Sequence, residues 1–268
     1  PSGPRRSFRS HNLHHFIDYI AANSLSLPQY AAAFAAVLFA TTMKSFAGFG
    51  FGLAVVPLLS LIVPPAVAVP MALALDMIGS TQLVPHARRI ADWHSLRRLV
   101  PAAFVAIPFG VYALTVIHPE TLRIGISVVL LITVALMASG AKLPLHLPLP
   151  AVLGVGAAAG ALSGGIAMPG PPVMIYFLAR PTAAAMNRAS LLMFFFFTDI
   201  GSIATGIVSG IVPMSTIIVA LTLAPALFIG NTLGHHLFGL ASDLHYRRIA
   251  LGLLAIIALS TLAQVILF

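Results

Sequence analysis

The sequence predicts an all-α polytopic membrane protein built from two inverted repeats, and three observations lead to this prediction. Of its 268 residues, 59% are hydrophobic and only 7% are charged, against about a quarter charged in ordinary soluble domains. Apolar runs of about 20 residues, the length of a membrane-spanning helix, recur along the chain. Two Gly-rich stretches interrupt these runs at similar places in the two halves of the chain.

Eight apolar runs are long enough to cross a membrane as single helices. They lie at 27–45, 66–85, 99–117, 121–139, 149–167, 184–207, 214–236 and 248–268. Two shorter runs, 48–63 and 171–180, each follow a Gly-rich stretch. At about 1.5 Å per residue the second of these rises only about 15 Å, so it cannot span the membrane alone. The residues before position 27 have arginines but no signal-peptide pattern, so we expect 1–26 to be a tail.

The charged residues exclude several other classes of protein. Fourteen Lys and Arg against six Asp and Glu give a net charge of +8, but the cations cluster in short loops between apolar runs. This placement indicates membrane orientation, and we predict no nucleic-acid partner. The chain has no cysteine, which excludes disulfides and cysteine metal sites. Most of its ten histidines lie in the tail, near loops or at a span end without supporting carboxylates, so we predict no metal and no cofactor.

An internal repeat relates the two Gly-rich stretches. When "KSFAGFGFGLAVVP" from Lys44 is set against "LSGGIAMPGPPVMI" from Leu162, Ser45 falls on Ser163 and Gly52 on Gly170. Further along, "DMIGS" resembles "DIGS", and "IPFG" resembles "LFIG". The matches keep the same order. They predict two repeats, at 27–140 and 149–268, joined by a Pro-rich linker at 141–148.

The basic loops predict that the second repeat is inverted relative to the first. We expect four groups of cations to be cytoplasmic: Arg88, Arg89, Arg97 and Arg98; Lys142; Arg180 and Arg188; Arg247 and Arg248. This requires an even number of crossings between successive loops. This requirement is met if each repeat has five segments and begins with a broken or re-entrant helical hairpin. Inverted repeats are typical of secondary transporters. The scheme leaves the basic amino tail outside, against the usual rule.

These features resemble one known family. "GFGFGLAVVPLL", "LSGGIAMPGPPVMIYFL", the basic stretch ending "RRIADW" and the duplicated layout are similar to the TauE/SafE family of sulfite exporters, across nearly all of 27–268. Phe49 and Phe51 in the first glycine run, and Met168 and Pro169 in the second, depart from the family pattern. The resemblance implies a multi-pass transporter of the bacterial inner membrane that exports small sulfur anions such as sulfite, thiosulfate or sulfoacetate.

The glycine breaks predict an anion site. Non-helical backbone at membrane depth is tolerated only where it faces protein or a water-filled cavity, and helix amino ends attract anions. Two hairpin tips meeting near the midplane would form such a site. The alternatives are that the glycines serve close helix packing and that Lys44 extends to the interface. The predicted substrate-binding residues are Lys44, Ser45, Gly50, Gly52, Ser163, Gly164, Gly165, Gly170, Asn187 and Arg188.

Two of the six acidic residues, Asp76 and Asp199, lie well inside predicted spans. A carboxylate within the membrane is a candidate proton carrier or the partner of a buried cation. We therefore expect Asp76 or Asp199 to couple transport to the proton gradient. The alternative is a neutral or paired aspartate that fastens two helices.

Two other functions remain as alternatives at this stage. A passive anion channel would have a similarly lined path. An intramembrane enzyme is disfavoured because Ser163 has no assignable base, the H-E-x-x-H motif is absent, and the mid-span aspartates lack a glycine-aspartate signature. We therefore predict that the chain is not an enzyme. The expected partners are a small sulfur anion and the lipid bilayer, and the sequence is compatible with a homodimer.

Overall fold

The computed structural model describes residues 26–47, 50–81, 83–139, 147–178, 182–212 and 214–238. These ranges are helical throughout, with short turns and no strands, which confirms the all-α part of the predicted fold class. Their helices are α2 (Leu27–Ala47), α3 (Phe51–Ser60), α4 (Pro65–Thr81), α5 (Val84–Ile90), α6 (Trp93–Val116), α7 (Pro119–Ser139), α8 (Leu149–Ile166), α9 (Gly170–Leu178), α10 (Ala184–Val208) and α11 (Met214–Phe238).

Five of these helices, α6, α7, α8, α10 and α11, are long and apolar enough to cross a membrane. They confirm five of the eight predicted spans. The predicted span at 66–85 is divided, because α4 ends at Thr81 and α5 begins at Val84; the two count as a sixth span only if taken together. The run at 27–45 forms the 21-residue helix α2, which is not among the five. The run at 248–268 lies outside the described residues.

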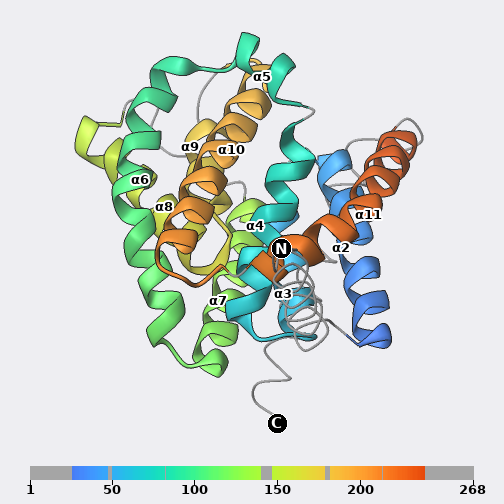
Figure 1. The fold of residues 1–268 in the computed structure, drawn as a ribbon. Helices are drawn as coiled ribbons and strands as arrows, with labels where there is room; N and C mark the ends of the chain where they lie inside the picture. Colours follow the sequence, from blue (N-terminus) through green and yellow to red (C-terminus); the bar gives the residue numbers. More distant parts are fainter. Residues whose placement is uncertain are drawn as a thin grey trace, which may run out of the picture.

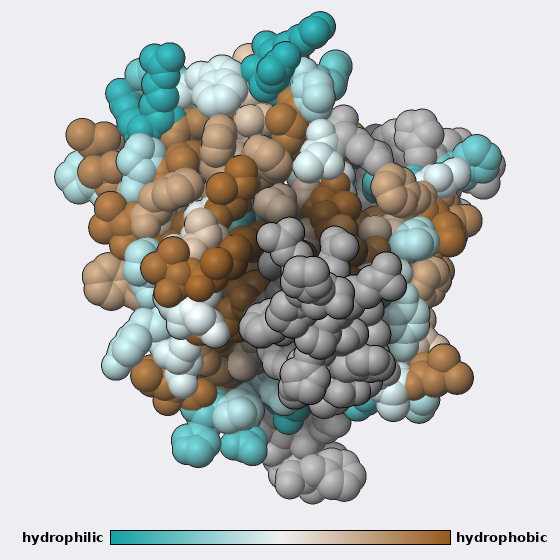
Figure 2. Space-filling model, in the orientation of Figure 1, coloured by the Kyte–Doolittle hydropathy of each residue, from teal (hydrophilic) through white to brown (hydrophobic). Residues whose placement is uncertain are grey.

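Polar and apolar side chains are separated on the molecular surface. In Figure 2, hydrophobic residues are frequent at middle height on the left of the visible face, while hydrophilic residues gather toward its upper and lower ends. The upper end in this view is the region of α5 in Figure 1. Large apolar side chains such as Phe109 and Val208 are 71% and 89% exposed. An apolar band between polar ends fits a multi-pass membrane protein.

The two short helices occupy the places that the glycine-rich stretches predicted. The ten-residue α3 begins after Gly50, whose φ of 94° lies in the left-handed region that favours glycine. The nine-residue α9 begins at Gly170, and α8 ends at Ile166, directly before Ala167 with its φ of 51°. The N–H groups of Ala167 and Met168 donate to carbonyls of the last turn of α8, at 3.0 and 3.2 Å. These bonds satisfy carbonyls that a helix end otherwise leaves without partners.

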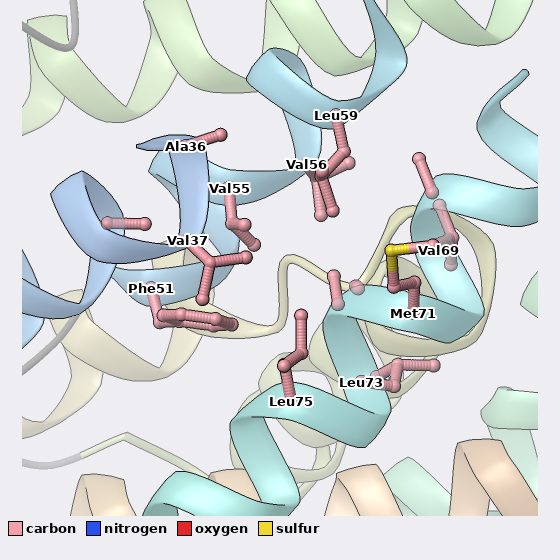
Figure 3. Packing of buried hydrophobic residues seen from close by; sticks show 14 of the residues in the cluster. Ala36, Val37, Phe51, Val55, Val56, Leu59, Val69, Met71, Leu73 and Leu75 are labelled. Carbon is pink, nitrogen blue, oxygen red and sulfur yellow. The ribbon is translucent and has the colours of Figure 1, made fainter. Parts of the chain in front are cut away.

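Two helix pairs flank the short helix α3 and its neighbour α4. In Figure 1, α2 packs with α11 on one side, and α6 packs with α8 on the other. The main apolar core lies between them, where α3 is mostly buried and α4 is buried at ten of its 17 residues, without a break over 68–75. Figure 3 shows Phe51, Val55 and Leu59 of α3 near Met71 and Leu75 of α4. Gly50, directly before α3, is therefore buried in protein, as non-helical backbone at membrane depth requires.

Candidate functional site

Lys44 and Asp76 form an ion pair inside the helix bundle. Lys44 lies in the last turn of α2, and its Nζ donates to the Asp76 carboxylate of α4 and, at 3.1 Å, to the Ser80 hydroxyl one turn further along α4. The Nζ atom also lies 5.6 Å from the centre of the Phe51 ring. The two charged side chains are only 12% and 14% exposed. Each charge therefore depends on the other, because a lone charge buried this far is costly.

A cavity of about 270 Å³ adjoins this ion pair. Helices α2, α3, α4, α10 and α11 surround it, and it combines one ion pair, one further cation, hydroxyl and amide groups and apolar walls. Its lining residues are Thr41, Lys44, Ser45, Phe51, Leu75, Asp76, Gly79, Leu83, Arg188, Leu192, Leu227 and Asn231. Half of the twelve lining residues are polar or charged, and such groups converging on a cavity with apolar walls are typical of a ligand site.

Arg188 supplies the second cation of this cavity. It lies in the first turns of α10, is exposed, and donates through one terminal nitrogen to the backbone carbonyl of Ser45 at 3.3 Å. The Ser45 hydroxyl in turn donates to the backbone carbonyl of Asn231 on α11, at 3.0 Å. Ser45, the neighbour of Lys44 in the chain, is thus joined to Arg188 and Asn231, which belong to the other predicted repeat.

The two predicted hairpin tips meet, but the space between them is small. A gap of about 20 Å³ is lined by Lys44, Gly50, Phe51, Gly52, Leu53, Asp76, Ala167, Met168, Pro169, Gly170 and Phe195. A space of this size holds about one water molecule. A Cβ on Gly52 would lie 2.2 Å from the carbonyl oxygen of Ala167, so Gly52 allows the tips to touch. The larger cavity of about 270 Å³ shares Lys44, Phe51 and Asp76 with this gap.

The amino end of α9 is also a poorer anion donor than the sequence comparison suggested. Pro171 and Pro172 follow Gly170, so two of the first three positions of α9 have no N–H group. The first turn of α3 has no such gap, because Phe51, Gly52 and Leu53 all retain their N–H groups. The two tips are therefore not equivalent in donor capacity.

Several residues of the predicted site lie elsewhere. Ser163 is fully buried, and its hydroxyl shares a 3.0 Å hydrogen bond with that of Ser202. Gly164 and Gly165 pack against the backbone of α6. The Asn187 side chain accepts a hydrogen bond from the Thr182 hydroxyl. None of these four residues lines the cavity that contains Lys44.

Asp199 is the second predicted intramembrane carboxylate, and its surroundings differ from those of Asp76. It is 2% exposed, and its Oδ2 atom has no hydrogen-bond partner among the described residues. It interacts electrostatically with Asp76 and Lys44. The structure therefore places the two predicted carboxylates within electrostatic reach of one lysine.

The sequence prediction missed three polar residues of the cavity region. Thr41 precedes Lys44 by almost one helical turn, and Ser80 follows Asp76 by one turn, so helical spacing alone places them on the same faces. Asn231 is a polar amide within the predicted span at 214–236. Its position in an otherwise apolar run was the available signal.

Comparison with known proteins identifies the family that the chain resembles. The chain matches the family model for the sulfite exporter TauE/SafE over residues 33–261. No curated protein and no solved structure matches it. The match extends from α2 through α11, so it includes every helix that lines the cavity. The chain therefore belongs to the TauE/SafE sulfite exporter family, a family of membrane transporters.

Proposed function

We propose that this protein exports small sulfur-containing anions, such as sulfite, thiosulfate or sulfoacetate, across the bacterial inner membrane by a proton-coupled mechanism. The observation that carries the proposal is the convergence of Lys44 and Arg188 on one cavity beside the breaks before α3 and α9. Family membership supports the substrate class.

The size and chemistry of the cavity suit a small oxyanion. At roughly 30 Å³ per water, a volume of about 270 Å³ holds about nine water molecules, or a small anion with some of its hydration. The guanidinium of Arg188 offers paired N–H groups that match two oxygens of a sulfur oxyanion. Lys44 adds a compact charge. Apolar walls from Phe51, Leu75 and Leu192 limit the number of donors, so that a bound anion can also leave.

In the expected orientation of the protein in the membrane, this cavity is the site at which the anion enters from the cytoplasm. Arg188 is exposed at its rim, and Leu83, which immediately precedes the basic helix α5, lines the same cavity. Both belong to segments whose Lys and Arg content favours the cytoplasmic side. A cavity open to the cytoplasm would take up an anion for export.

Reciprocal helix packing supports the two inverted repeats. Gly110 of α6 faces the backbone of α8, and Gly230 of α11 faces the backbone of α2. These glycines hold matching positions in the predicted repeats, 27–140 and 149–268. Each of them packs against the first helix of the other repeat, an arrangement suited to rocking one repeat against the other around a central site.

Flux into liposomes tests the proposal. We expect purified protein to give saturable flux of sulfite, thiosulfate and sulfoacetate that responds to a pH gradient, with less for taurine and chloride. Lys44→Ala and Arg188→Ala should each raise the half-saturating concentration at least about tenfold, since hydrogen bonds to charged groups contribute about 1.5–3 kcal/mol. Arg97→Ala removes an exposed cation of α6 outside the cavity and is the control.

Three results would contradict the proposal. Equal effects of Arg97→Ala and Lys44→Ala would mean that only overall charge matters. Unchanged flux in Lys44→Ala and Arg188→Ala would place the anion elsewhere. Flux that rises without saturation and ignores the pH gradient would indicate a passive channel.

A further inference from the structure

We infer that Asp76 competes with the transported anion for Lys44, so that a doubly charged anion binds together with one proton. The inference rests on the proposed anion site and adds a rule about which charge state that site accepts. Its starting point is that Lys44, the cation nearest the hairpin tips, is already paired with a carboxylate in this structure.

The charges around the cavity can be counted. Among the described residues that line it, only Lys44, Asp76 and Arg188 are charged, which gives a net charge of +1. A singly charged anion balances this charge. A doubly charged anion leaves an excess negative charge in a largely desolvated space, which is costly. Protonation of Asp76 raises the net charge to +2 and removes that excess.

Asp76 is the carboxylate that the anion would displace. Its charged and titratable neighbours are Lys44 on α2 and, on α10, Arg188 at the rim and Asp199, which interacts with it electrostatically. The cavity walls contributed by α3 and α11 contain no titratable side chain. An anion that binds the Nζ atom of Lys44 separates Asp76 from its cation. Asp76 then keeps the uncharged Ser80 hydroxyl nearby. Asp199 does not line the cavity and has no ion pair with Lys44 to lose.

The net charge that crosses the membrane follows from this exchange. A doubly charged anion with one proton carries one negative charge, as does a singly charged anion without a proton. An inside-negative membrane potential favours outward movement of one negative charge by about 2.3 kcal/mol per 100 mV. One cavity can therefore export sulfur anions of either charge with the same electrical driving force.

Calorimetry of anion binding to the full-length protein tests the inference. Thiosulfate, which keeps two charges from mildly acidic to mildly alkaline pH, should bind the parent protein more weakly as pH rises, approaching about tenfold per pH unit for one linked proton. In Asp76→Asn the affinity should be nearly independent of pH. Glu120→Gln, which neutralises an exposed carboxylate at the start of α7, is the matched control and should keep the parent slope.

Proton uptake by the parent protein provides a test that needs no variant. Binding measured in buffers of different ionisation enthalpy should show close to one proton taken up per thiosulfate and far fewer per methanesulfonate, which has one charge. A parent slope retained in Asp76→Asn, a slope lost only in Asp199→Asn, or equal proton uptake with both anions would overturn the inference while leaving the anion site standing. Absence of thiosulfate binding at every pH would overturn the proposed function as well.

Discussion

At the scale of single residues, Ser45 and Ser163 show how matched positions in a repeat acquire different environments. Ser45 lines the cavity next to Lys44 and reaches the Asn231 carbonyl, whereas Ser163 is buried against Ser202 between α8 and α10. Their alignment in the sequence predicted equal roles. Both hydroxyls have a hydrogen-bond partner within the protein, but only Ser45 also lines the cavity, and the bond of Ser163 joins α8 to α10.

Ser163→Ala should therefore reduce stability without changing anion affinity. Loss of the 3.0 Å hydrogen bond leaves the buried Ser202 hydroxyl without this partner and should cost about 0.5–1.5 kcal/mol. Thermal unfolding in detergent measures the first effect, and thiosulfate calorimetry measures the second. An increase in the dissociation constant like that of Lys44→Ala, with unchanged thermal stability, would return Ser163 to the anion site.

At the scale of elements, a row of glycines on α8 allows close contact with α6. Gly156, Gly160 and Gly164, spaced one turn apart, face the carbonyl oxygens of Leu99, Ala103 and Ile107. A Cβ on Gly160 would lie 2.2 Å from the Ala103 oxygen. These contacts agree with the alternative interpretation of the sequence, in which glycines allow close helix packing. Small residues at this spacing are common where two membrane helices meet.

Gly160→Ala should destabilise the α6–α8 pair by about 1–3 kcal/mol, as overpacking does in other tightly packed interiors. Gly154→Ala is the matched control, because a Cβ at Gly154 meets nothing within 4 Å. Alanine at that position should keep or slightly raise the unfolding temperature, since it also favours the helix. Equal unfolding temperatures for the two variants would show that α6 and α8 are not in close contact in the membrane protein.

At the scale of the whole molecule, the sequence predicted local features better than contacts between residues far apart in the chain. Span positions and the breaks before α3 and α9 follow from apolar runs and glycines, which act within a few residues. The pairing of Lys44 with Asp76, 32 positions away, depends on which faces of α2 and α4 meet. The contact between Ser45 and Asn231 likewise depends on which faces of α2 and α11 meet. At the second break the left-handed conformation is taken by Ala167 and not by a glycine. The N–H groups of Ala167 and Met168 donate to carbonyls in the last turn of α8, and these hydrogen bonds hold Ala167 in that conformation.

The orientation of the whole molecule decides whether the cavity loads from the cytoplasm. Between α5 and the start of α10 the chain passes through α6, α7 and the α8–α9 segment. If α8 and α9 enter and leave on the same side, Arg89 and Ala183 face the cytoplasm together. His118, between α6 and α7, and Ser209, after α10, should then face the opposite side. All four positions are exposed.

Single cysteines at these positions test the arrangement directly, since the chain has none of its own. We expect Arg89→Cys and Ala183→Cys to react with a membrane-impermeant thiol reagent only in inside-out vesicles, and His118→Cys and Ser209→Cys only in intact cells. Labelling of positions 89 and 183 from opposite sides would require an odd number of crossings between them. In that case α8 and α9 would together traverse the membrane, the second repeat would not be inverted as predicted, and the rim formed by Leu83 and Arg188 would no longer mark a cytoplasmic entrance.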